Sequence, residues 1–321
     1  MQNIYIFGYK GQDGTLLKLK LESSKLDIKF FLIAKDSLKI VYKNLVLKEL
    51  KILNDLDYLD LIGKLIIDNR PNLIFYFAAV HLAATENEKN ANISNMFFTN
   101  YALVSFVFNR CLILGYKPKF IYASSSLIFS GSDTSPQNEK TSRKPKCNYA
   151  RQKVLSEELL IKLGEKYEIP VLIPIFYNHE SIKRKEKFFT KKIISYCSKK
   201  SKNNDISLDQ KIQLFNPDSV IDMGYAPEYI DLLLKLTFSD NTGSYIFSSG
   251  RPITVKNFVN YVLEYYGLSK DIILYSSIKP RFQIQLIGDN KKLSQAIGSV
   301  PSLNNKNLVN RLCNDYENNI S

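Results

Sequence analysis

The chain has 321 residues, 45% of them hydrophobic, and carries 44 Lys and Arg against 31 Asp and Glu. This length suits one large α/β unit or two interleaved domains and needs no disulfide staples. The four cysteines show no C-x-x-C spacing, and with only two histidines we expect no metal site. Because we find neither a basic-then-apolar leader nor an apolar run approaching 18 residues, we expect a reduced, cytoplasmic protein with no membrane partner.

The net charge of +13 is compatible with a nucleic acid, an anionic membrane surface or an acidic small substrate. Nine Lys and Arg fall between Lys183 and Lys202 against one acid, Glu186. Such a concentrated positive segment would attract a nucleotide diphosphate. The plain alternative is a basic helix and loop that simply face water.

The N-terminal segment predicts a strand–turn–helix unit. Residues 3–8 read as a strand, and leucines after Thr15 indicate the start of a helix. Between them lies Gly8-x-x-Gly11-x-x-Gly14, where a pyrophosphate would meet a helix N-terminus, although a glycine turn can also serve packing. The residues predicted to contact a dinucleotide here are Gly8, Gly11, Gln12, Asp13 and Gly14.

A second strand over residues 27–34 ends in Lys35, Asp36 and Ser37, about 20 residues past the last glycine. Asp36 could accept from two ribose hydroxyls, as with NAD. Lys35 and Ser37 could hold a 2′-phosphate, as with NADP. We therefore expect NADP or NAD, with a slight preference for NADP.

Two further segments predict contacts with the cofactor. A short strand over residues 50–53 precedes an acid that could accept from the adenine amino group, and a strand over residues 72–79 ends in small residues that let the backbone approach a ligand. An amphipathic helix over residues 58–69 separates them, and Pro71 stops it. The contact residues predicted here are Asp55, Leu56, Ala78 and Ala79.

Tyr149 and Lys153 stand four residues apart at the start of a helix predicted over residues 149–167. The i, i+4 spacing puts both side chains on one helix face. A nearby ammonium lowers the pKa of a phenol, so Tyr149 would be poised as an acid/base. Together with the glycine turn, this pair indicates nicotinamide redox chemistry.

Strands and helices alternate along most of the chain, which predicts a doubly wound parallel α/β Rossmann sheet. A fifth strand over residues 119–124 precedes a serine run, and a strand over residues 171–177 follows the Tyr/Lys helix. We expect a dinucleotide-binding domain over residues 1–177, with a returning segment near 212–237. A smaller C-terminal α/β substrate domain would span residues 178–321.

At this point the residues resemble the extended short-chain dehydrogenase/reductase family, and within it the GDP-mannose 4,6-dehydratase branch. The most specific matches are Gly8-Tyr9-Lys10-Gly11-Gln12-Asp13-Gly14 and Phe176-Tyr177-Asn178-His179-Glu180-Ser181, the latter followed in step by Phe188, Thr190 and Lys192. The resemblance covers nearly the whole chain. It implies a sugar nucleotide bound between a cofactor domain and a smaller C-terminal domain.

The resemblance also implies roles for particular residues. Tyr149 would take the proton of the sugar C4 hydroxyl, Ser125 would polarise its oxygen, and Lys153 would bridge the nicotinamide ribose. Asn100 would orient the lysine or a water, and His179 would contact the cofactor. Predicted substrate contacts are Ser126, Asn178, Lys183, Arg184, Lys191, Lys279 and Arg281.

Two positions depart from the family pattern. Leu127 replaces the Glu that removes the C5 proton in the dehydratases, and Ile221 replaces an arginine that clamps the diphosphate. Leucine cannot move a proton, so His81, which titrates near neutral pH, becomes the candidate base. A structural histidine is the alternative. Glu180 is a weaker candidate, because the family keeps it even where the usual Glu is present.

The leading hypothesis is a 4,6-dehydratase-like enzyme acting on a GDP-hexose for a surface glycan. The rival enzyme hypothesis is a C4 dehydrogenase, epimerase or 4-keto reductase, which needs no C5 base. A remote alternative is a non-catalytic relative that binds phosphate or RNA. We expect a nucleotide sugar and no nucleic acid as partner, and a homodimer or homotetramer through helices near residues 101–114 and 150–166, as the resemblance implies.

Overall fold

The computed structural model describes residues 1–52, 54–81, 92–186, 188–202, 211–277 and 285–319, and it divides into two compact units. Unit 1 comprises residues 1–128, 145–176 and 230–245, and unit 2 comprises residues 129–144, 177–229 and 246–321. The returning segment therefore differs from the expected 212–237. The first strand of that segment, β10 (Ile212–Phe215), pairs with β14 (Ile273–Ser276) inside unit 2.

Among the described residues, nine strands form the sheet of unit 1, in the order β12-β8-β6-β5-β1-β2-β3-β4 with β7 beside β8. From β2 to β8 the neighbours pair in parallel, which confirms the predicted parallel sheet for this part. The strands of the parallel region and its β12 edge are β1 (Gln2–Phe7), β2 (Ile28–Ile33), β5 (Leu73–Tyr76), β6 (Lys119–Tyr122), β7 (Ser124–Ser125), β8 (Val171–Phe176) and β12 (Gly243–Phe247).

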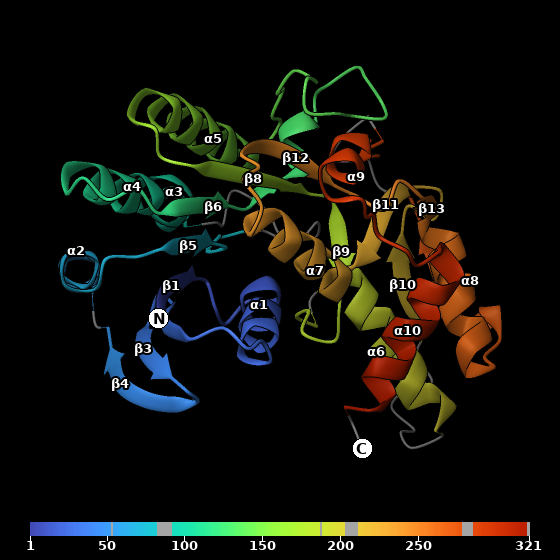
Figure 1. Cartoon of the computed structure of the whole chain (residues 1–321). Helices are drawn as coiled ribbons and strands as arrows, with labels where there is room; N and C mark the ends of the chain where they lie inside the picture. The colour runs from blue at the N-terminus through green and yellow to red at the C-terminus, as the bar shows by residue number, and fades with distance from the viewer. Residues whose placement is uncertain (53, 82–91, 187, 203–210, 278–284, 320–321) are drawn as a thin grey trace. The chain divides into compact units, whose positions relative to one another are not determined.

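Helices cover both faces of this sheet. Figure 1 shows α2, α4 and α5 on one face and α1 on the other. Double coverage buries the central strands on both sides, and residues 4–7 and 73–76 are accordingly apolar or aromatic and buried. The helices with residues in unit 1 are α1 (Gln12–Glu22), α2 (Asp55–Asn69), α3 (Ile93–Phe97), the π-helix η2 (Phe98–Ala102), α4 (Leu103–Ile113), α5 (Asn148–Tyr167) and α7 (Ala226–Thr237), which begins in unit 2.

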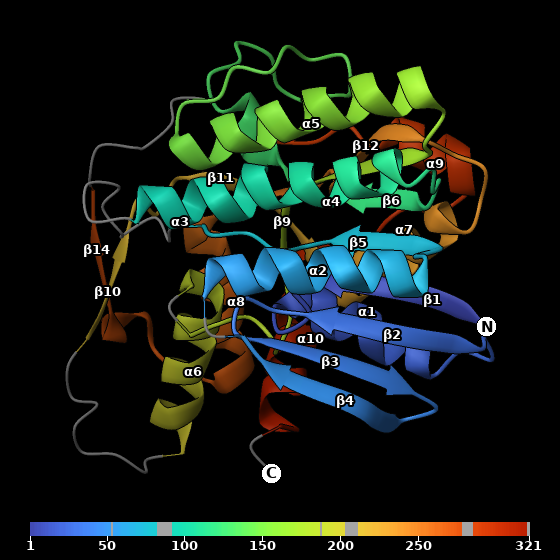
Figure 2. The same cartoon turned by 90° about the vertical axis from the view of Figure 1, so that its left-hand side faces the viewer.

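The β2 side of the sheet departs from the predicted strand–helix alternation. Instead of a crossover helix, β2 is followed by β3 (Ser37–Tyr42) and β4 (Leu45–Lys51), which pair antiparallel and lie side by side in Figure 2. The two turn residues, Lys43 and Asn44, have φ of 47° and 63°. Two consecutive positive φ angles make the tight turn whose twist suits a hairpin. The predicted strand over 50–53 thus matches the end of β4 only at residues 50 and 51, and β3 was missed. Leu53 lies outside the described residues.

Unit 2 has its own small sheets and core. β11 (Val220–Tyr225) pairs in parallel with β9 (Asn178–Glu180) and antiparallel with β13 (Pro252–Thr254). Side chains of α6 (Phe189–Ser201), α8 (Val255–Tyr266) and α10 (Asn305–Glu317) form a buried apolar cluster with these strands. The basic segment between Lys183 and Lys202 includes all of α6, which continues to Ser201. The remaining helix of seven residues is α9 (Lys291–Ile297).

The continuous helical stretch Ile93–Ile113 is long and apolar enough to cross a membrane by length and composition alone. It does not contradict the expectation of no apolar run approaching 18 residues, because polar residues such as Asn100 interrupt the stretch, whose mean hydropathy is 1.3. Core helices of water-soluble proteins pass the same test, so one such helix is weak evidence for a membrane span.

The order of the strands reverses between β1 and β5, since the chain leaves β1 for β2 on one side and reaches β5 on the other. Ligands of open α/β sheets bind at such a switch point, outside the carboxyl ends of the strands. Here Gly8 follows β1 with a φ of 82°, and a Cβ added to it would lie 2.6 Å from the backbone nitrogen of Ala78, just after β5. Only glycine fits where these two strand ends meet.

Replacing Gly8 with alanine should therefore destabilise the protein by about 2–4 kcal/mol, because the change adds a backbone clash to an unfavourable φ. Gly115→Ala is the matched control: Gly115 also has a positive φ, of 67°, but a Cβ there meets nothing within 4 Å. Urea unfolding of both variants measures the difference. Equal destabilisation would show that the contact with Ala78 contributes nothing beyond the φ.

Candidate active site

The glycine turn prepares the N-terminus of α1 for an anion. Gly11 occupies the N-cap position without a side-chain cap, so the first amides of α1 lack a side-chain acceptor there. A Cβ on Gly14 would lie 2.6 Å from the carbonyl oxygen of Gly8, which keeps the turn tight against the helix. Open amides at a helix N-terminus attract phosphate. The residues present therefore fit the pyrophosphate of a dinucleotide.

A residue of the glycine turn, Lys10, forms an ion pair with the segment that follows β2. Lys10 donates to both carboxylate oxygens of Asp36, at 2.7 and 2.9 Å, and Ser37 donates to the same carboxylate at 3.1 Å. The Lys10 ammonium holds the pKa of Asp36 below its ordinary value. Lys35 instead donates to Asn95 at 2.7 Å. The acid that favours NAD is thus already paired with a cation.

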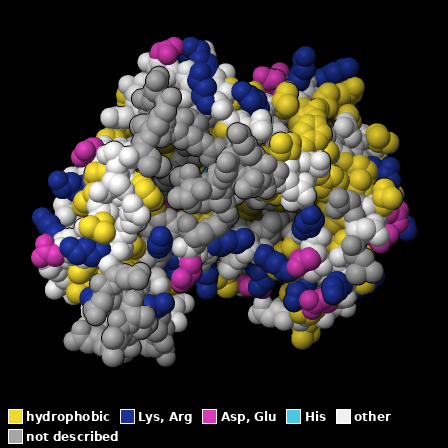
Figure 3. Space-filling model, turned by 180° about the vertical axis from the view of Figure 1, so that it is seen from behind, with side chains coloured by type: hydrophobic (Ala, Val, Ile, Leu, Met, Phe, Trp, Pro, Cys, Tyr) yellow, Lys and Arg dark blue, Asp and Glu magenta, His cyan; other side chains and the backbone are white. Residues whose placement is uncertain are grey.

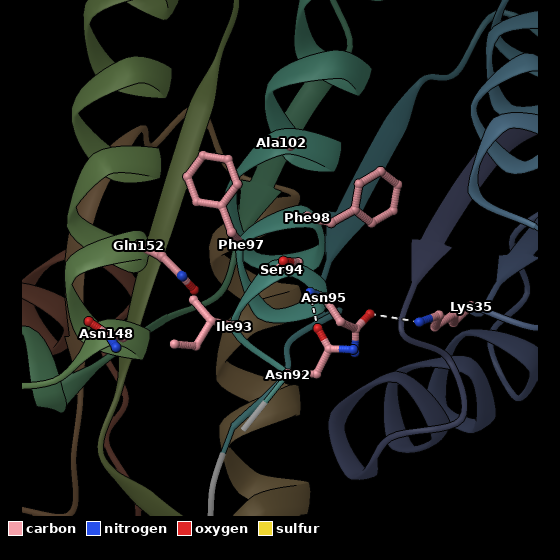
Figure 4. A pocket seen from close by; sticks show the side chains of 10 residues that line it. All are labelled: Lys35, Asn92, Ile93, Ser94, Asn95, Phe97, Phe98, Ala102, Asn148 and Gln152. Atoms are coloured by element: carbon pink, nitrogen blue, oxygen red, sulfur yellow. Dashed lines mark hydrogen bonds between the residues drawn. The ribbon is translucent and has the colours of Figure 1, made fainter. Parts of the chain in front are cut away.

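A cavity of about 730 Å³ opens in unit 1 between Lys35 and the start of α5. Figure 4 shows the Lys35–Asn95 bond at one end of it and the side chains of Asn148 and Gln152 at the other. Phe97 and Phe98 supply its apolar lining. Unit 1 therefore has room for a ligand with both polar and aromatic parts next to the segment that follows β2.

Tyr149 and Lys153 occupy the same face of α5, as their spacing predicts. The Lys153 ammonium lies 5.7 Å from the Tyr149 ring centroid and 4.6 Å from that of Tyr122 on β6. It donates to the carbonyl oxygen of Ala123 at 2.7 Å. The face of α5 that carries the pair is therefore bound to the strand end that leads into Ser125.

Lys153 is 1% exposed, and this burial lowers the pKa of its ammonium from 10.5 to about 7, while Glu157 one turn along the helix acts in the opposite direction. Removing a cation from water disfavours its charged form. The lysine is therefore near its protonation midpoint at neutral pH, and small changes in its surroundings change its charge.

The remaining predicted catalytic residues also belong to unit 1. Ser125 lies in β7, and its hydroxyl accepts from the backbone nitrogen of Leu127 at 3.3 Å. The ring of His81 meets the ring of Tyr149 edge to face, with centroids 4.6 Å apart. The structure therefore brings the candidate base to the candidate acid/base, whereas the side chain at position 127 is apolar.

Asn100 does not contact Lys153 as predicted. It is fully buried in η2, where its side chain accepts from Val80 at 2.9 Å and donates to the Val80 carbonyl and to Gln152. Single π-helical turns within α-helices are frequent at functional sites. Here the turn aims Asn100 at the backbone just before His81, so Asn100 links that segment to α5.

Several other predicted contact residues have partners of their own. The backbone amide of Leu56 donates to the N-cap Asn54 of α2, and Leu56 is 80% exposed. Gln12 donates to Asp13 at 3.3 Å, and Ser126 is buried at the start of the short 3₁₀ helix η3 (Ser126–Phe129). The side chain of Asp55 lies outside the described residues.

The predicted substrate contacts at Asn178, Lys183, Arg184 and Lys191 belong to unit 2, so their joining the residues of unit 1 stays a prediction. Asn178 and Lys183 are exposed. The guanidinium of Arg184 stacks 3.8 Å above the Phe188 ring. Lys191 donates to the carbonyl of Ile182 at 2.9 Å, and burial lowers the pKa of this ammonium, so its first role here is to hold the loop before α6.

His179, predicted to contact the cofactor, is buried in unit 2, where its Nδ1 lies 2.8 Å from the Tyr177 carbonyl oxygen and its ring stacks on Tyr229. Lys279 and Arg281 lie outside the described residues. In the described ranges, no group of three or more His, Cys, Asp or Glu side chains could hold a metal ion.

The sequence analysis assigned no role of their own to three residues near the site. Lys10 was read only as part of the glycine turn, and Ser124 only as part of the serine run. Glu157 was overlooked, although its position at i+8 from Tyr149 puts it on the same face of α5. The helical spacing was the signal that could have found it.

The sequence model of the family described as GDP-mannose 4,6 dehydratase matches residues 5–312. The chain belongs to this family. The members of this family are NAD(P)-dependent nucleotide-sugar enzymes. A GDP-mannose 4,6-dehydratase of Sinorhizobium fredii is 30% identical over 160 residues, which are 50% of this chain and 44% of that protein. The segment of this chain that matches therefore spans about half the length of the Sinorhizobium protein.

Solved structures share the fold over almost the whole chain. RMD from Pseudomonas aeruginosa, complexed with NADPH, superposes with a TM-score of 0.81 at 16% identity, covering 99% of this chain and 100% of that one. A UDP-glucose 4-epimerase from Thermotoga maritima, with UDP-glucose, gives 0.79 at 16% identity and covers both chains fully. At these identities the likeness establishes the fold alone.

The burial of Lys153 should add a contribution that rises with pH to the free energy of unfolding of this family member. Buried cysteines such as Cys111, whose pKa burial raises, contribute in the opposite direction above about pH 8.5. Between about pH 7 and pH 10 the unfolded chain binds a proton at Lys153 that the folded chain does not, so the contribution of this lysine increases, by at most about 1.4 kcal/mol per pH unit. Urea midpoints at pH 7.5 and 9.5 measure this. Lys153→Met should flatten the rise, whereas the exposed control Lys25→Met should keep it; parallel profiles for all three proteins would contradict the prediction.

Proposed function

We propose that this chain is an NADP-dependent enzyme that oxidises C4 of a nucleotide-activated hexose, and that a GDP-hexose 4,6-dehydration is its full reaction. The main observation that supports this proposal is the arrangement of Tyr149 and the buried Lys153 on one face of α5. Lys153 donates to Ala123 at the strand end that leads into Ser125, and the ring of Tyr149 contacts the ring of His81. The family membership supports a nucleotide sugar as substrate.

The residues of the chain divide the work by their chemistry. A bound nicotinamide would supply the hydride acceptor for C4, held by the glycine turn and the segment after β2. The charge of Lys153 stabilises the phenolate of Tyr149, which takes the proton of the C4 hydroxyl and becomes a phenol as the hydride leaves C4, and Ser125 donates a hydrogen bond to the C4 oxygen. These three side chains suffice for oxidation and reduction at C4.

Water loss would remove the C5 proton and the C6 hydroxyl, and the hydride taken from C4 would then return to C6, so that the cofactor ends the reaction unchanged. Removal of the C5 proton needs a further base, because Leu127 offers none. His81 is the described titratable side chain in ring contact with Tyr149, at 4.6 Å between centroids, and an imidazole takes up a proton near neutral pH. We assign the removal of the C5 proton to His81. The second candidate function is a C4 dehydrogenase, epimerase or 4-keto reductase, and Leu127 is the observation that favours it.

The pairing of Asp36 with Lys10 supports NADP over NAD. With its carboxylate engaged, Asp36 is a poorer acceptor for a ribose diol, and Lys10, Lys35 and Ser37 supply cation and hydroxyl donors for a 2′-phosphate. This proposal is independent of the sugar that is bound.

A homodimer through α4 and α5 remains part of the proposal. Figure 3 shows hydrophobic side chains gathered on the side of unit 1 where these helices lie. Ile113 on α4 and Leu155 on α5 are 73% and 45% exposed, and Ile93 and Phe97 on α3 are also exposed. Exposed apolar patches of this kind mark surfaces for association.

Incubation of the purified protein with GDP-, UDP- and CDP-hexoses, followed by mass spectrometry of each sugar nucleotide, tests the reaction. We expect one GDP-hexose to lose one water. Loss of two hydrogens only, or a change of stereochemistry at constant mass, would replace the dehydratase with the C4 dehydrogenase or epimerase.

The role of His81 is separated from its packing by two variants. His81→Phe keeps a ring against Tyr149 but cannot move a proton, and His81→Ala loses both. We expect both variants to reduce NADP within a single turnover at the wild-type rate, while water loss falls by at least about 100-fold. Full dehydration by His81→Phe would exclude His81 as the base.

Lys10→Ala should weaken the binding of NADPH about tenfold and leave NADH nearly unchanged, since only NADPH carries the 2′-phosphate. Titration of nicotinamide fluorescence measures both constants without turnover. Lys18→Ala, which removes an exposed-face ion pair with Glu22 on α1, is the control. Equal losses for the two nucleotides would place Lys10 away from the 2′ position.

A further inference from the structure

Glu157 is a buried acid that the proposed reaction does not use. It lies on α5 two turns after Tyr149 and one turn after Lys153, and it is 2% exposed. A carboxylate taken out of water is costly unless it is paired or hydrogen-bonded. Its presence among apolar neighbours therefore calls for partners close by.

Two such partners are present. The hydroxyl of Ser124 donates to a carboxylate oxygen of Glu157 in a short hydrogen bond, and Ser124 is itself buried. The ammonium of Lys153 interacts with Glu157 through its charge. Glu157 thus faces a cation on its own helix and a hydroxyl on β7.

The same two segments are joined at two successive residues. Ala123 accepts from Lys153, Ser124 donates to Glu157, and the next residue along the strand is Ser125. Because strand residues 123–125 are held to the face of α5 by both a cation and an acid, the position of Ser125 relative to Tyr149 depends on that pairing.

The other polar groups described around Lys153 are two tyrosine rings and a backbone carbonyl. The ring of Tyr122, from β6, lies 4.6 Å from the ammonium, and Tyr149, which contacts His81, lies beyond it on α5. The carbonyl of Ala123 supplies a dipole. Among these described neighbours, Glu157 is the group that carries a full negative charge when ionised.

We propose that Glu157 is a positioning residue: its buried carboxylate, one helical turn from Lys153, favours the charged form of this lysine and, through Ser124, fixes the strand end that presents Ser125. The inference rests on the proposed function for the catalytic role of Lys153. The interactions of Glu157 with Lys153 and Ser124 are those of the protein without substrate. Burial would otherwise deprotonate a lysine at this place, and a neutral lysine could not stabilise the phenolate of Tyr149.

Two variants separate the charge of Glu157 from its hydrogen bond. Glu157→Gln removes the charge and keeps an oxygen that accepts from Ser124. Ser124→Ala removes the hydrogen bond and keeps the charge. If Glu157 acted only through its hydrogen bond to the strand end, Ser124→Ala would disturb the site and Glu157→Gln would leave it nearly unchanged.

The test is the protonation of Lys153 in the full-length protein without substrate. Carbon-13 NMR of lysine labelled at Cε follows its titration, with the signal assigned by its absence in Lys153→Met. We expect Glu157→Gln to lower the pKa of Lys153 by about one unit or more and Ser124→Ala to change it by much less. An unchanged pKa in Glu157→Gln would overturn the proposal, whatever substrate the protein turns over.

The kinetic consequence follows once a substrate is known. Activity that requires the protonated lysine is lost as pH rises through its pKa, so the alkaline limb of the kcat/KM profile should move to lower pH by the same amount in Glu157→Gln. Ser124→Ala should lower kcat at all pH values without moving that limb. A fully active Glu157→Gln with an unmoved limb would contradict the positioning role even if the proposed reaction is correct.

Discussion

The buried ammonium of Lys153 is the interaction on which the candidate site depends. This ammonium is buried where α5 packs against the segment that connects β6 to β7. The carbonyl of Ala123 and the carboxylate of Glu157 stabilise it there. A buried charge destabilises the fold unless its partners lie at hydrogen-bonding or ion-pairing distance, because they offset the cost of desolvation. This need for partners around Lys153 therefore fixes the relative positions of Tyr149 and Ser125.

A second constraint lies at the switch point of the sheet. Gly8 and Ala78 approach so closely that a side chain on Gly8 would collide with the neighbouring backbone. This contact joins the end of β1, which opens the glycine turn, to the end of β5, which leads to His81. The pyrophosphate end and the catalytic end of the site in unit 1 are thus built on adjacent strand ends, and the backbone holds them in register.

Local pattern predicted the elements that carry chemistry better than the elements that shape their surroundings. The glycine turn after β1 and the Tyr149–Lys153 spacing on α5 are short-range features, and the parallel sheet follows from the buried strands. The β3–β4 hairpin was missed because its turn is Lys43-Asn44, without the glycine that usually signals two positive φ angles. Asn100 and Lys191 were assigned to ligands, yet tertiary hydrogen bonds engage both, and no sequence pattern shows which of several possible partners a buried amide or ammonium will choose.

The residues that differ from the family pattern divide the proposed reaction into two halves. Everything that oxidation at C4 requires is kept, since Ser125, Tyr149 and Lys153 lie on two elements that the buried lysine binds together. The group that dehydration requires is gone from position 127, where an apolar side chain follows the same strand end. Loss of a base from an intact redox site leaves either a shorter reaction or the same reaction with a relocated base, and the edge-to-face contact of His81 with Tyr149 favours relocation. The histidine reaches the site from the segment after β5 instead of from the strand end that carries Ser125, so the C5 proton would be removed by a group that can be lost or altered without disturbing the oxidation at C4.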